Sequence, residues 1–531
     1  MNGPRIAATA SALLLAACST LPPSQQPGME PVVAPAPSPA PTYGGPAEEA
    51  AVKTVERIRA IDGQLNSVLA IDPTWQEQAR RVDAAGIRGP LAGKPVLIKD
   101  NIDTLGPLPT TAGSLALANN VTNRDSPLVA RLRAAGAIIV GKTNLSEWAN
   151  IRSSDSISGW SAVGGQTRNP YALDRNTCGS SSGSGAAVAA GLVSLAVGTE
   201  TDGSITCPAA MNGVVGLKPT LGLIPRTHIV PISESQDTAG PMTATVAEAA
   251  VMLTVMAGSD PADPATKEAD ARKIDYAAGL SADALRGKRI GVLRFATGFG
   301  TNAAFDKALE TLKAAGAELV EIKEFTGGNF GDAEFQVLLT EFKAGLNDYL
   351  KNSPAPLPAR TLAEVIAFNQ AHAAREMPLF GQDIFDMAEK TKGLTDPAYR
   401  KARADSLRMA GAEGIDRLLK QHNVVALVAP SRPAAWKIDA VHGDVSPGGN
   451  GVGSMAAVAG YPHLTVPMGL IRGLPVGISF FGPKWSDGLL LQLGYAFEQA
   501  RGPLPAPRFL PSIEQSPEVA PALGRQLQPG N

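Results

Sequence analysis

The sequence has few of the residues that most often carry metal or redox chemistry. Its 531 residues include only three cysteines and five histidines. No two cysteines have CxxC spacing and no histidine lies in an HExxH segment, so the common zinc-binding patterns are absent. We therefore expect a protein without a metal or another cofactor.

Charge and nucleotide-binding motifs are also scarce. The formal net charge is only −2, which gives no positive surplus for contacts with nucleic-acid phosphates. No GxxxxGK[ST] or GxGxxG segment follows an expected strand, so the sequence does not support nucleotide binding. We expect no nucleic-acid partner.

The apolar stretch near the N-terminus, residues 6–17, is too short to span a bilayer as a helix. It ends in Leu15-Ala16-Ala17-Cys18, which resembles a bacterial lipobox, a signal whose cysteine is lipidated and becomes the new N-terminus. An ordinary cleaved signal peptide is the alternative. We expect residues 1–17 to be a lipoprotein signal peptide and Cys18 to anchor the protein to the membrane of the bacterial cell envelope. Ser19 favours the outer membrane, facing the periplasm.

The rest of the chain divides by composition. Residues 18–46 are rich in proline and predict an extended tether, residues 47–510 form the body, and residues 511–531 predict a loose tail. Within the body, a Ser-Pro helix start at residue 126 lies between apolar runs at 96–98 and 137–140. The order strand, helix, strand predicts parallel pairing in an α/β fold. A strand is also expected at 289–293, and a closing amphipathic helix at about 487–500.

Two loops of small residues, 177–185 and 198–204, suggest a functional site. Glycine and serine allow close backbone approach and supply hydroxyl groups without bulk. A short helix at 186–190 and a strand at 192–197 separate the loops, so both can meet at one edge of a sheet. Cys178 and Cys207 flank them, either as a disulfide or, in the plainer interpretation, as two buried thiols.

Lys99 ends the apolar run at 96–98, where an ammonium group is unusual. By itself it is most simply a lysine that snorkels to solvent. A buried lysine has a lowered pKa, however, and can act as the base that a serine nucleophile needs. The glycine before Ser204 would let backbone N–H groups converge on an oxyanion. Lys99 and the two serine loops are therefore together consistent with an acyl-transfer site in which a lysine, rather than a histidine, is the base.

Four segments in order, at 94–101, 179–184, 201–205 and 216–220, together resemble the amidase signature family. The resemblance covers about residues 50–500. It implies a single large α/β domain with a mixed central sheet flanked by helices. It also implies a catalytic triad in which Lys99 is the base, Ser180 follows a cis peptide bond and Ser204 is the nucleophile. By the same resemblance, the oxyanion hole is formed by Thr201, Asp202 and Gly203, and the supporting residues are Ser181 and Thr199.

The sequence departs from the common family pattern at two positions. Asp202 stands where many members have glycine, and Thr206 where many have arginine. This version, with the segments 235–237 and 341–347, is similar to bacterial peptide amidases, which deamidate C-terminal peptide amides. The expected partner is therefore a small-molecule or short-peptide amide, hydrolysed to acid and ammonia.

Other functions remain open on the sequence alone. The substrate can instead be a simple aliphatic or aryl amide or ester. An amidotransferase subunit shares the signature, but its work is cytoplasmic and the lipobox argues against it. A catalytically inactive binding lipoprotein is disfavoured because all three triad positions are occupied by the expected residues. Nothing in the sequence indicates the oligomeric state.

Overall fold

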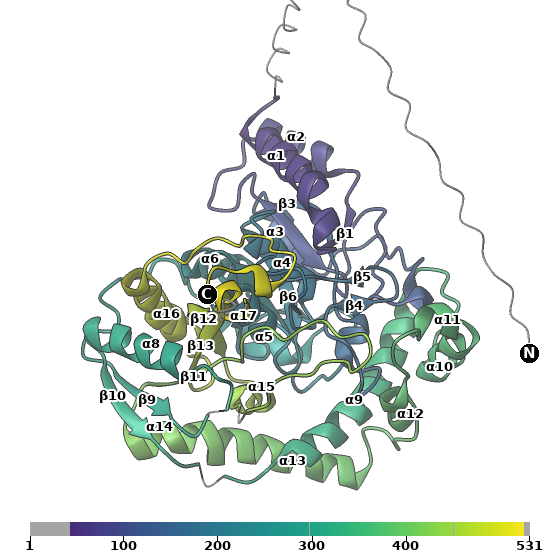
Figure 1. Ribbon diagram of the computed structural model, residues 1–531. Coiled ribbons are helices and arrows are strands. Elements are labelled where there is room, and N and C mark those ends of the chain that lie inside the picture. The colour runs from purple at the N-terminus through teal and green to yellow at the C-terminus, as the bar shows by residue number, and fades with distance from the viewer. Residues whose placement is uncertain (1–42, 297, 326, 450, 525–531) are drawn as a thin grey trace, which may run out of the picture. The chain divides into compact units, whose positions relative to one another are not determined.

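A mixed sheet of eleven strands forms the centre of the protein (Figure 1). The strands lie in the order β1-β3-β2-β6-β8-β7-β12-β13-β11-β9-β10. A separate pair, β4 and β5, lies outside it. The strand bounds are β1 Val68–Ile71, β2 Pro95–Lys99, β3 Ile138–Thr143, β4 Trp160–Ser161, β5 Gly165–Gln166, β6 Leu195–Glu200, β7 Val215–Lys218, β8 Thr238–Thr243, β9 Arg289–Leu293, β10 Glu318–Ile322, β11 Ala426–Pro430, β12 His463–Ile471 and β13 Leu474–Phe481.

The computed structural model describes residues 43–296, 298–325, 327–449 and 451–524. The predicted signal peptide, Cys18 and nearly all of the predicted tether lie outside these residues. The helices are α1 Pro46–Ile61, α2 Trp75–Ala85, α3 Pro127–Ala134, α4 Ser182–Ala189, α5 Thr206–Asn212, α6 Val246–Met256, α7 Ala269–Arg272, α8 Asn302–Ala314, α9 Gly331–Asn352, α10 Leu362–Ala371, α11 Ala373–Glu376, α12 Asp383–Glu389, α13 Pro397–Ala410, α14 Asp416–His422, α15 Gly453–Ala459, α16 Asp487–Arg501 and α17 Ala520–Leu523.

The first half of the sheet has the predicted strand–helix–strand arrangement. β2 pairs in parallel with both β3 and β6, and α3 and α4 lie on the connections between these strands. Pro127 begins α3, and Gly136, at φ 84°, follows its end in the left-handed conformation that glycine adopts without strain. The α/β class with a mixed sheet is confirmed, and the parallel strands bring their carboxyl ends to one edge.

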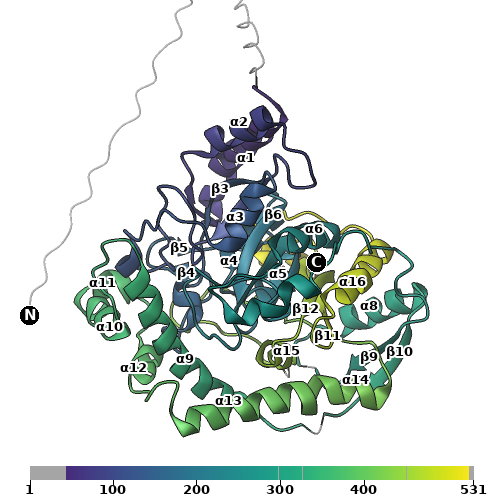
Figure 2. The same cartoon turned by 180° about the vertical axis from the view of Figure 1, so that it is seen from behind.

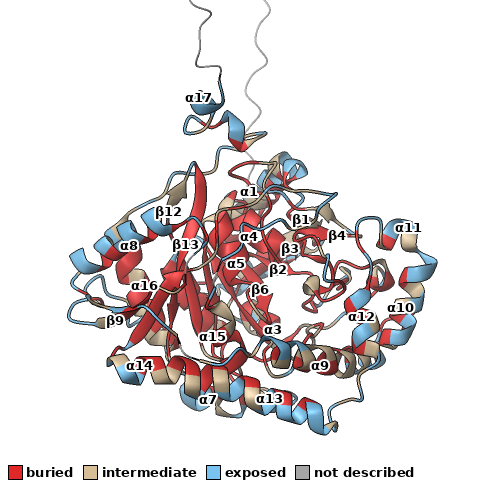
Figure 3. Ribbon diagram, turned by 60° about the horizontal axis from the view of Figure 1, so that its bottom comes forward, coloured by how far each residue is buried: buried red, intermediate tan, exposed pale blue. Residues whose placement is uncertain are grey.

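Helices cover both faces of the sheet, so its interior strands are buried, whereas the edge strands β1 and β10 are partly exposed (Figure 3). One apolar cluster joins the sheet to α3, α6, α8 and α16. A second cluster joins the other face to α1, α4 and α5. Burial on both faces explains why β2 and β6 read as continuous apolar runs rather than alternating ones.

A further group of helices, from α9 to α12, packs beside the sheet around its own apolar cluster (Figure 2). Phe342 and Leu346 of α9 are fully buried there and belong to the same cluster as Val230 and Ile232 of the loop before β8. This group places α9 along one side of the edge where the serine loops lie. Among the described residues, no helix has the length and hydrophobicity needed to cross a membrane.

Three local details differ from or refine the sequence analysis. The segment 512–516 lies within the expected loose tail, yet Ser512 Oγ donates to Asp174 and Ile513 is buried. Residues 136–143 match the nucleotide-binding pattern GxxxxGKT. They form strand β3 and the two residues before it, however, and are not a loop that follows a strand. Lys142 of this segment is buried and donates to the carbonyl oxygen of Ile102 at 2.7 Å, so it is held by the protein itself.

Candidate active site

The two serine loops meet, as the sequence analysis expected. The backbone N–H of Ser181 donates to the carbonyl oxygen of Ser204 at 3.0 Å, which joins the loops directly. The Ser181 hydroxyl also donates to the carbonyl oxygen of Thr199 at 3.0 Å. The peptide bond between Gly179 and Ser180 is cis, which agrees with the family resemblance.

Cys178 and Cys207 form a disulfide, with their Cα atoms 5.9 Å apart. The plainer interpretation of two buried thiols was therefore wrong. Because Cys178 lies two residues before Ser180 and Cys207 three residues after Ser204, the bond ties the two serine loops together. Spacing alone did not reveal this pairing, since it depends on how closely the loops approach each other in the fold.

Lys99 ends β2 and is completely buried, so it does not snorkel to solvent. Its Nζ lies 2.8 Å from Ser180 Oγ and 2.8 Å from Thr199 Oγ1. The simpler interpretation was wrong because β2 is an interior strand between β3 and β6, so its end is covered on all sides. The structure thus brings Lys99, Ser180 and Thr199 into one hydrogen-bonded group.

Burial lowers the pKa of Lys99 to about 7, although the carboxylates of Asp237 and Glu200 act in the opposite direction. An ammonium group that cannot be hydrated loses stability relative to the neutral amine. A substantial fraction of Lys99 is therefore neutral near pH 7, and a neutral amine can accept a proton from a hydroxyl group.

Asn101 and Thr199 complete the surroundings of Lys99. Asn101 Nδ2 donates to Thr199 Oγ1 at 3.0 Å, so the threonine hydroxyl is oriented from both sides. The sequence analysis placed Thr199 in a supporting position but did not identify Asn101. Its position two residues beyond Lys99, at the same strand end, is the signal that would have identified it.

The turn that leads from β6 to Ser204 is folded around Glu200. Its Oε2 accepts hydrogen bonds from the backbone N–H groups of Ile205 at 2.8 Å and Thr206 at 2.9 Å. The Thr206 hydroxyl binds the same oxygen at 3.2 Å, so the residue that replaces the family's arginine supports the turn. Glu200 could have been identified from the sequence, because it is a charged residue at the end of a buried strand, as Lys99 is.

This turn presents four unpaired backbone donors. None of the backbone N–H groups of residues 201–204 donates a hydrogen bond to another described residue. The Ser204 side chain is almost buried, and its hydroxyl makes no hydrogen bond in the same set of residues. The Ser180 hydroxyl is bound by Lys99 and makes no direct hydrogen bond to the Ser204 hydroxyl in the described part of the chain. The free N–H groups can bind an anionic oxygen.

Asp202 and Gly203, the middle of this turn, face two other parts of the chain. Asp202 Oδ2 accepts a hydrogen bond from Ser454 of α15 at 2.6 Å. Gly203 has φ 83°, and a Cβ at this position would lie 2.8 Å from Nη2 of Arg432. Arg432 follows β11 and was not identified from the sequence.

Asp237 holds the beginning of the turn. Its Oδ1 accepts a hydrogen bond from Thr201 Oγ1 at 2.5 Å, and its Oδ2 accepts from the backbone N–H of Ile232 at 2.8 Å. Burial raises the pKa of Asp237, while the hydrogen bond from Thr201 lowers it. The segment containing Asp237 was noted in the sequence, but its contact with Thr201 depends on the pairing of β6 with β8.

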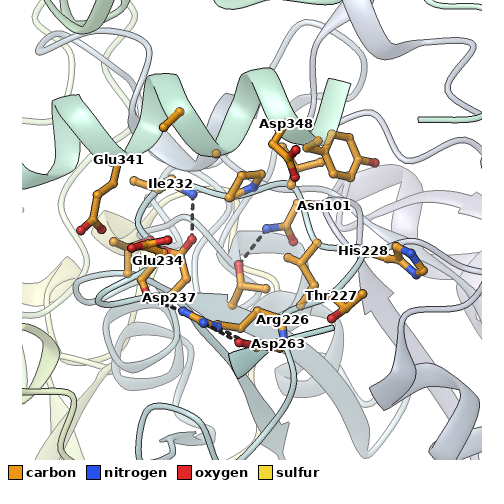
Figure 4. Close-up of a pocket in the computed structure, with 18 of the residues that line it drawn as sticks. Asn101, Arg226, Thr227, His228, Ile232, Glu234, Asp237, Asp263, Glu341 and Asp348 are labelled. Atoms are coloured by element: carbon orange, nitrogen blue, oxygen red, sulfur yellow. Dashed lines mark hydrogen bonds and ion pairs between the residues drawn. The ribbon is translucent and has the colours of Figure 1, made fainter. Parts of the chain in front are cut away.

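A cavity of about 620 Å³ opens beside this group (Figure 4). Asn101, Thr199 and Thr201 line it on the side of the site, and α9 lines it opposite. The lining does not include Lys99, Ser180 or Ser204 themselves. Its volume lies in the range of pockets that enclose small ligands. Among the described residues, no group of three or more histidine, cysteine or acidic side chains is arranged to hold a metal ion.

Comparisons with known proteins agree with this geometry. The family described as Amidase matches residues 49–491. A probable amidase of Arabidopsis thaliana is 40% identical over 430 residues, covering 79% of this chain and 79% of the plant protein. A glutamyl-tRNA(Gln) amidotransferase subunit of Roseiflexus castenholzii is 36% identical over 475 residues, covering 83% of this chain and 90% of its own.

Among solved structures, the native peptide amidase from Stenotrophomonas maltophilia is 50% identical, with a TM-score of 0.83 over 87% of this chain and 95% of that one. The corresponding glutamyl-tRNA(Gln) amidotransferase subunit of Thermotoga maritima is 26% identical, with a TM-score of 0.65 over 87% of this chain and 95% of its own. The family match covers most of the body, and relatives 36–50% identical cover 79–87% of the chain. The chain therefore belongs to the amidase signature family and is an amide-hydrolysing enzyme.

Proposed function

We propose that this enzyme hydrolyses the C-terminal amide of a peptide to a carboxylic acid and ammonia through a Ser204–Ser180–Lys99 triad. The observation that carries the proposal is the completely buried contact between Lys99 Nζ and Ser180 Oγ at 2.8 Å. The lowered pKa of Lys99 supplies a base, and the loop contact between Ser181 and Ser204 brings the nucleophile's segment to that base.

The first half-reaction forms an acyl-enzyme. As Ser204 Oγ attacks the amide carbonyl carbon, its proton passes to Ser180 Oγ, and the proton of Ser180 passes to neutral Lys99. The tetrahedral intermediate then collapses as Ser180 donates a proton to the amide nitrogen and is reprotonated by Lys99. The C–N bond breaks, ammonia leaves and an ester to Ser204 remains.

The second half-reaction uses the same groups with water as the nucleophile. Ser180 and Lys99 accept the proton of the attacking water, and the ester bond to Ser204 breaks as its oxygen is reprotonated. In both intermediates the negative oxygen is stabilised by backbone N–H groups of residues 201–204. Their lack of partners within the described residues supports this role, because donors aimed at a developing charge need no rearrangement during the reaction.

A peptide amide is favoured as substrate over the alternatives. One peptide amidase of known structure is 50% identical to this chain, and a peptide amidase solved in complex with the competitive inhibitor chymostatin is 51% identical. The amidotransferase subunits of Thermotoga maritima and Roseiflexus castenholzii are less similar to this chain, at 26% and 36% identity. The cavity beside Thr199 and Thr201 offers space for a short peptide.

The direct test is ammonia release from a peptide amide such as N-acetyl-phenylalaninamide. We expect turnover by the wild-type enzyme and none by Ser204→Ala or Lys99→Ala, with both variants folded by circular dichroism. Turnover of free esters or aliphatic amides alone, with no ammonia from any peptide amide, would refute the proposed substrate class. Full activity in Ser204→Ala would refute the proposed nucleophile.

We also propose that the enzyme is anchored to the bacterial outer membrane, on the periplasmic side, through lipid on Cys18. The lipobox at 15–18 supports this location. Cys18→Ser should move the protein from the membrane fraction to the soluble fraction without changing its specific activity. Persistence of the variant in the membrane fraction would contradict lipid anchoring at this residue.

A further inference from the structure

Arg432 lies at the nucleophile turn without a partner of its own. A Cβ on Gly203 would be 2.8 Å from its Nη2, so the guanidinium lies directly over the residue before Ser204. Arg432 is only partly exposed, yet it makes no hydrogen bond or ion pair with another described residue. By contrast, Arg226 in the neighbouring loop is bound to Asp263 through two nitrogen atoms. A partly desolvated guanidinium next to a nucleophile is a donor in need of an acceptor.

Asp202, which precedes Gly203 in the sequence, has the complementary feature. Its Oδ2 is bound by Ser454, but its Oδ1 is shielded from solvent and has no hydrogen-bond partner among the described residues. A carboxylate oxygen without a donor is costly to bury. An unpaired acceptor on Asp202 and an unpaired donor on Arg432, which follows β11, therefore both lie next to Gly203.

A peptide group has the opposite pair of functions. In a peptide amide, the residue that carries the scissile carboxamide is preceded by a peptide group with one N–H donor and one carbonyl acceptor. A simple aliphatic or aryl carboxamide has neither. Asp202 and Arg432 can each bind one of these two groups without giving up an existing contact to the protein.

We propose that Asp202 and Arg432 form a subsite that binds the peptide group on the acyl side of the scissile amide. Asp202 Oδ1 accepts a hydrogen bond from its N–H, and Arg432 donates to its carbonyl oxygen. The subsite makes the enzyme selective for amides of acylated amino acids and peptides over simple carboxamides. This inference rests on the proposed amide hydrolysis and adds to it the part of the substrate that is recognised.

The test compares two substrates that differ only in this group. N-acetyl-phenylalaninamide has the peptide group, and 3-phenylpropionamide has the same side chain and carboxamide without it. The readout is the ratio of their kcat/KM values, because this ratio does not depend on how much of a variant is folded. We expect Arg432→Gln and Asp202→Asn each to lower the ratio roughly 10- to 100-fold, the range for loss of a hydrogen bond to a charged group. Arg417→Gln, which removes a partly buried guanidinium from α14, is the matched control and should leave the ratio unchanged.

A third substrate separates the two contacts. In 2-acetoxy-3-phenylpropanamide an ester oxygen replaces the N–H and the acceptor carbonyl is kept. This replacement should reduce kcat/KM in the wild-type enzyme and in Arg432→Gln, but not further in Asp202→Asn. It needs no additional variant, so it remains informative if one substitution impairs folding.

Two results would overturn the inference while leaving amide hydrolysis intact. One is an equal loss on both substrates in the variants, which would mean that Arg432 and Asp202 act on the oxyanion or on the turn. The other is an unchanged ratio in both variants. Release of no ammonia from either substrate by the wild-type enzyme would instead refute the proposed function, and with it the subsite.

Discussion

Lys99 Nζ lies 2.8 Å from Ser180 Oγ, and neither side chain is exposed to solvent. The two residues are 81 positions apart and come from a strand end and a loop. Because the amine is buried, solvent does not stabilise its charge. Ser180 is followed by Ser181, whose backbone N–H donates to the carbonyl oxygen of Ser204 and so joins this pair to the nucleophile's segment. Two consequences of this buried pair can be measured.

The first consequence concerns the pH dependence of catalysis. Because burial lowers the pKa of Lys99 to about 7 and only the neutral amine accepts a proton, activity should increase with pH. We expect kcat/KM for a peptide amide to rise through an apparent pKa near 7 and to level off by about pH 8, an interval set by that pKa. A profile that is flat from pH 6 to pH 8, or that falls over this interval, would contradict Lys99 as the base.

The second consequence concerns stability. In the unfolded chain a lysine has a pKa of about 10.4, well above its pKa of about 7 in the folded protein. Between these values the unfolded state binds more protons, so this group makes the free energy of unfolding increase with pH over that window. Lys99→Met should be more stable than wild type at pH 6, measured by urea unfolding. Lys142→Met is the control and should be less stable, because it would leave the buried carboxylate of Asp100, 3.4 Å from Lys142 Nζ, without its cation.

The glycine before the nucleophile gives a third prediction. Gly203→Ala should reduce kcat strongly, because φ 83° strains alanine and its Cβ would lie 2.8 Å from Arg432. Gly86→Ala is matched for backbone strain, with φ 60° and no atom within 4 Å of the added Cβ. Each should lose about 1 kcal/mol of stability from the backbone. Normal activity in Gly203→Ala would show that the position of this turn does not matter.

The disulfide gives a fourth prediction. The double variant Cys178→Ser, Cys207→Ser should lose about 2–4 kcal/mol of stability, as is typical when a native disulfide is removed. Its activity should also fall, because the bond ties the segments of Ser180 and Ser204. Thermal unfolding of wild type with a reductant should approach that of the variant, and the reductant should not affect the variant. Equal midpoints in all four samples would mean that the thiols are unbonded in solution.

Elements with locally encoded patterns could be predicted from the sequence. β9 occupies residues 289–293 as expected, and α16 ends within one residue of its expected end. β9 is a short apolar run and α16 an amphipathic helix, and both patterns are encoded locally. β8 was not predicted, because its sequence Thr-Ala-Gly-Pro-Met-Thr has weak strand propensity and its place in the sheet comes from pairing with β6 and β7.

The candidate site shows the same division. Lys99, Ser180 and Ser204 could be placed from motifs, and the structure brings the Lys99–Ser180 pair and the Ser204 turn together. Asp237 could not be assigned its contact with Thr201, since that depends on the antiparallel register that places Thr238 opposite Glu200. Arg432 lies more than two hundred residues from Gly203 in the sequence, and no local pattern indicates that they touch.

The central claim is that the acyl group is carried by Ser204. Its most direct test is mass spectrometry of the enzyme after reaction with a serine-directed fluorophosphonate, with the modified peptide identified by fragmentation. We predict one adduct, on Ser204, that is absent in Ser204→Ala and suppressed by excess peptide amide. An adduct on Ser180, Ser181 or any other residue, together with continued turnover by Ser204→Ala, would contradict the account.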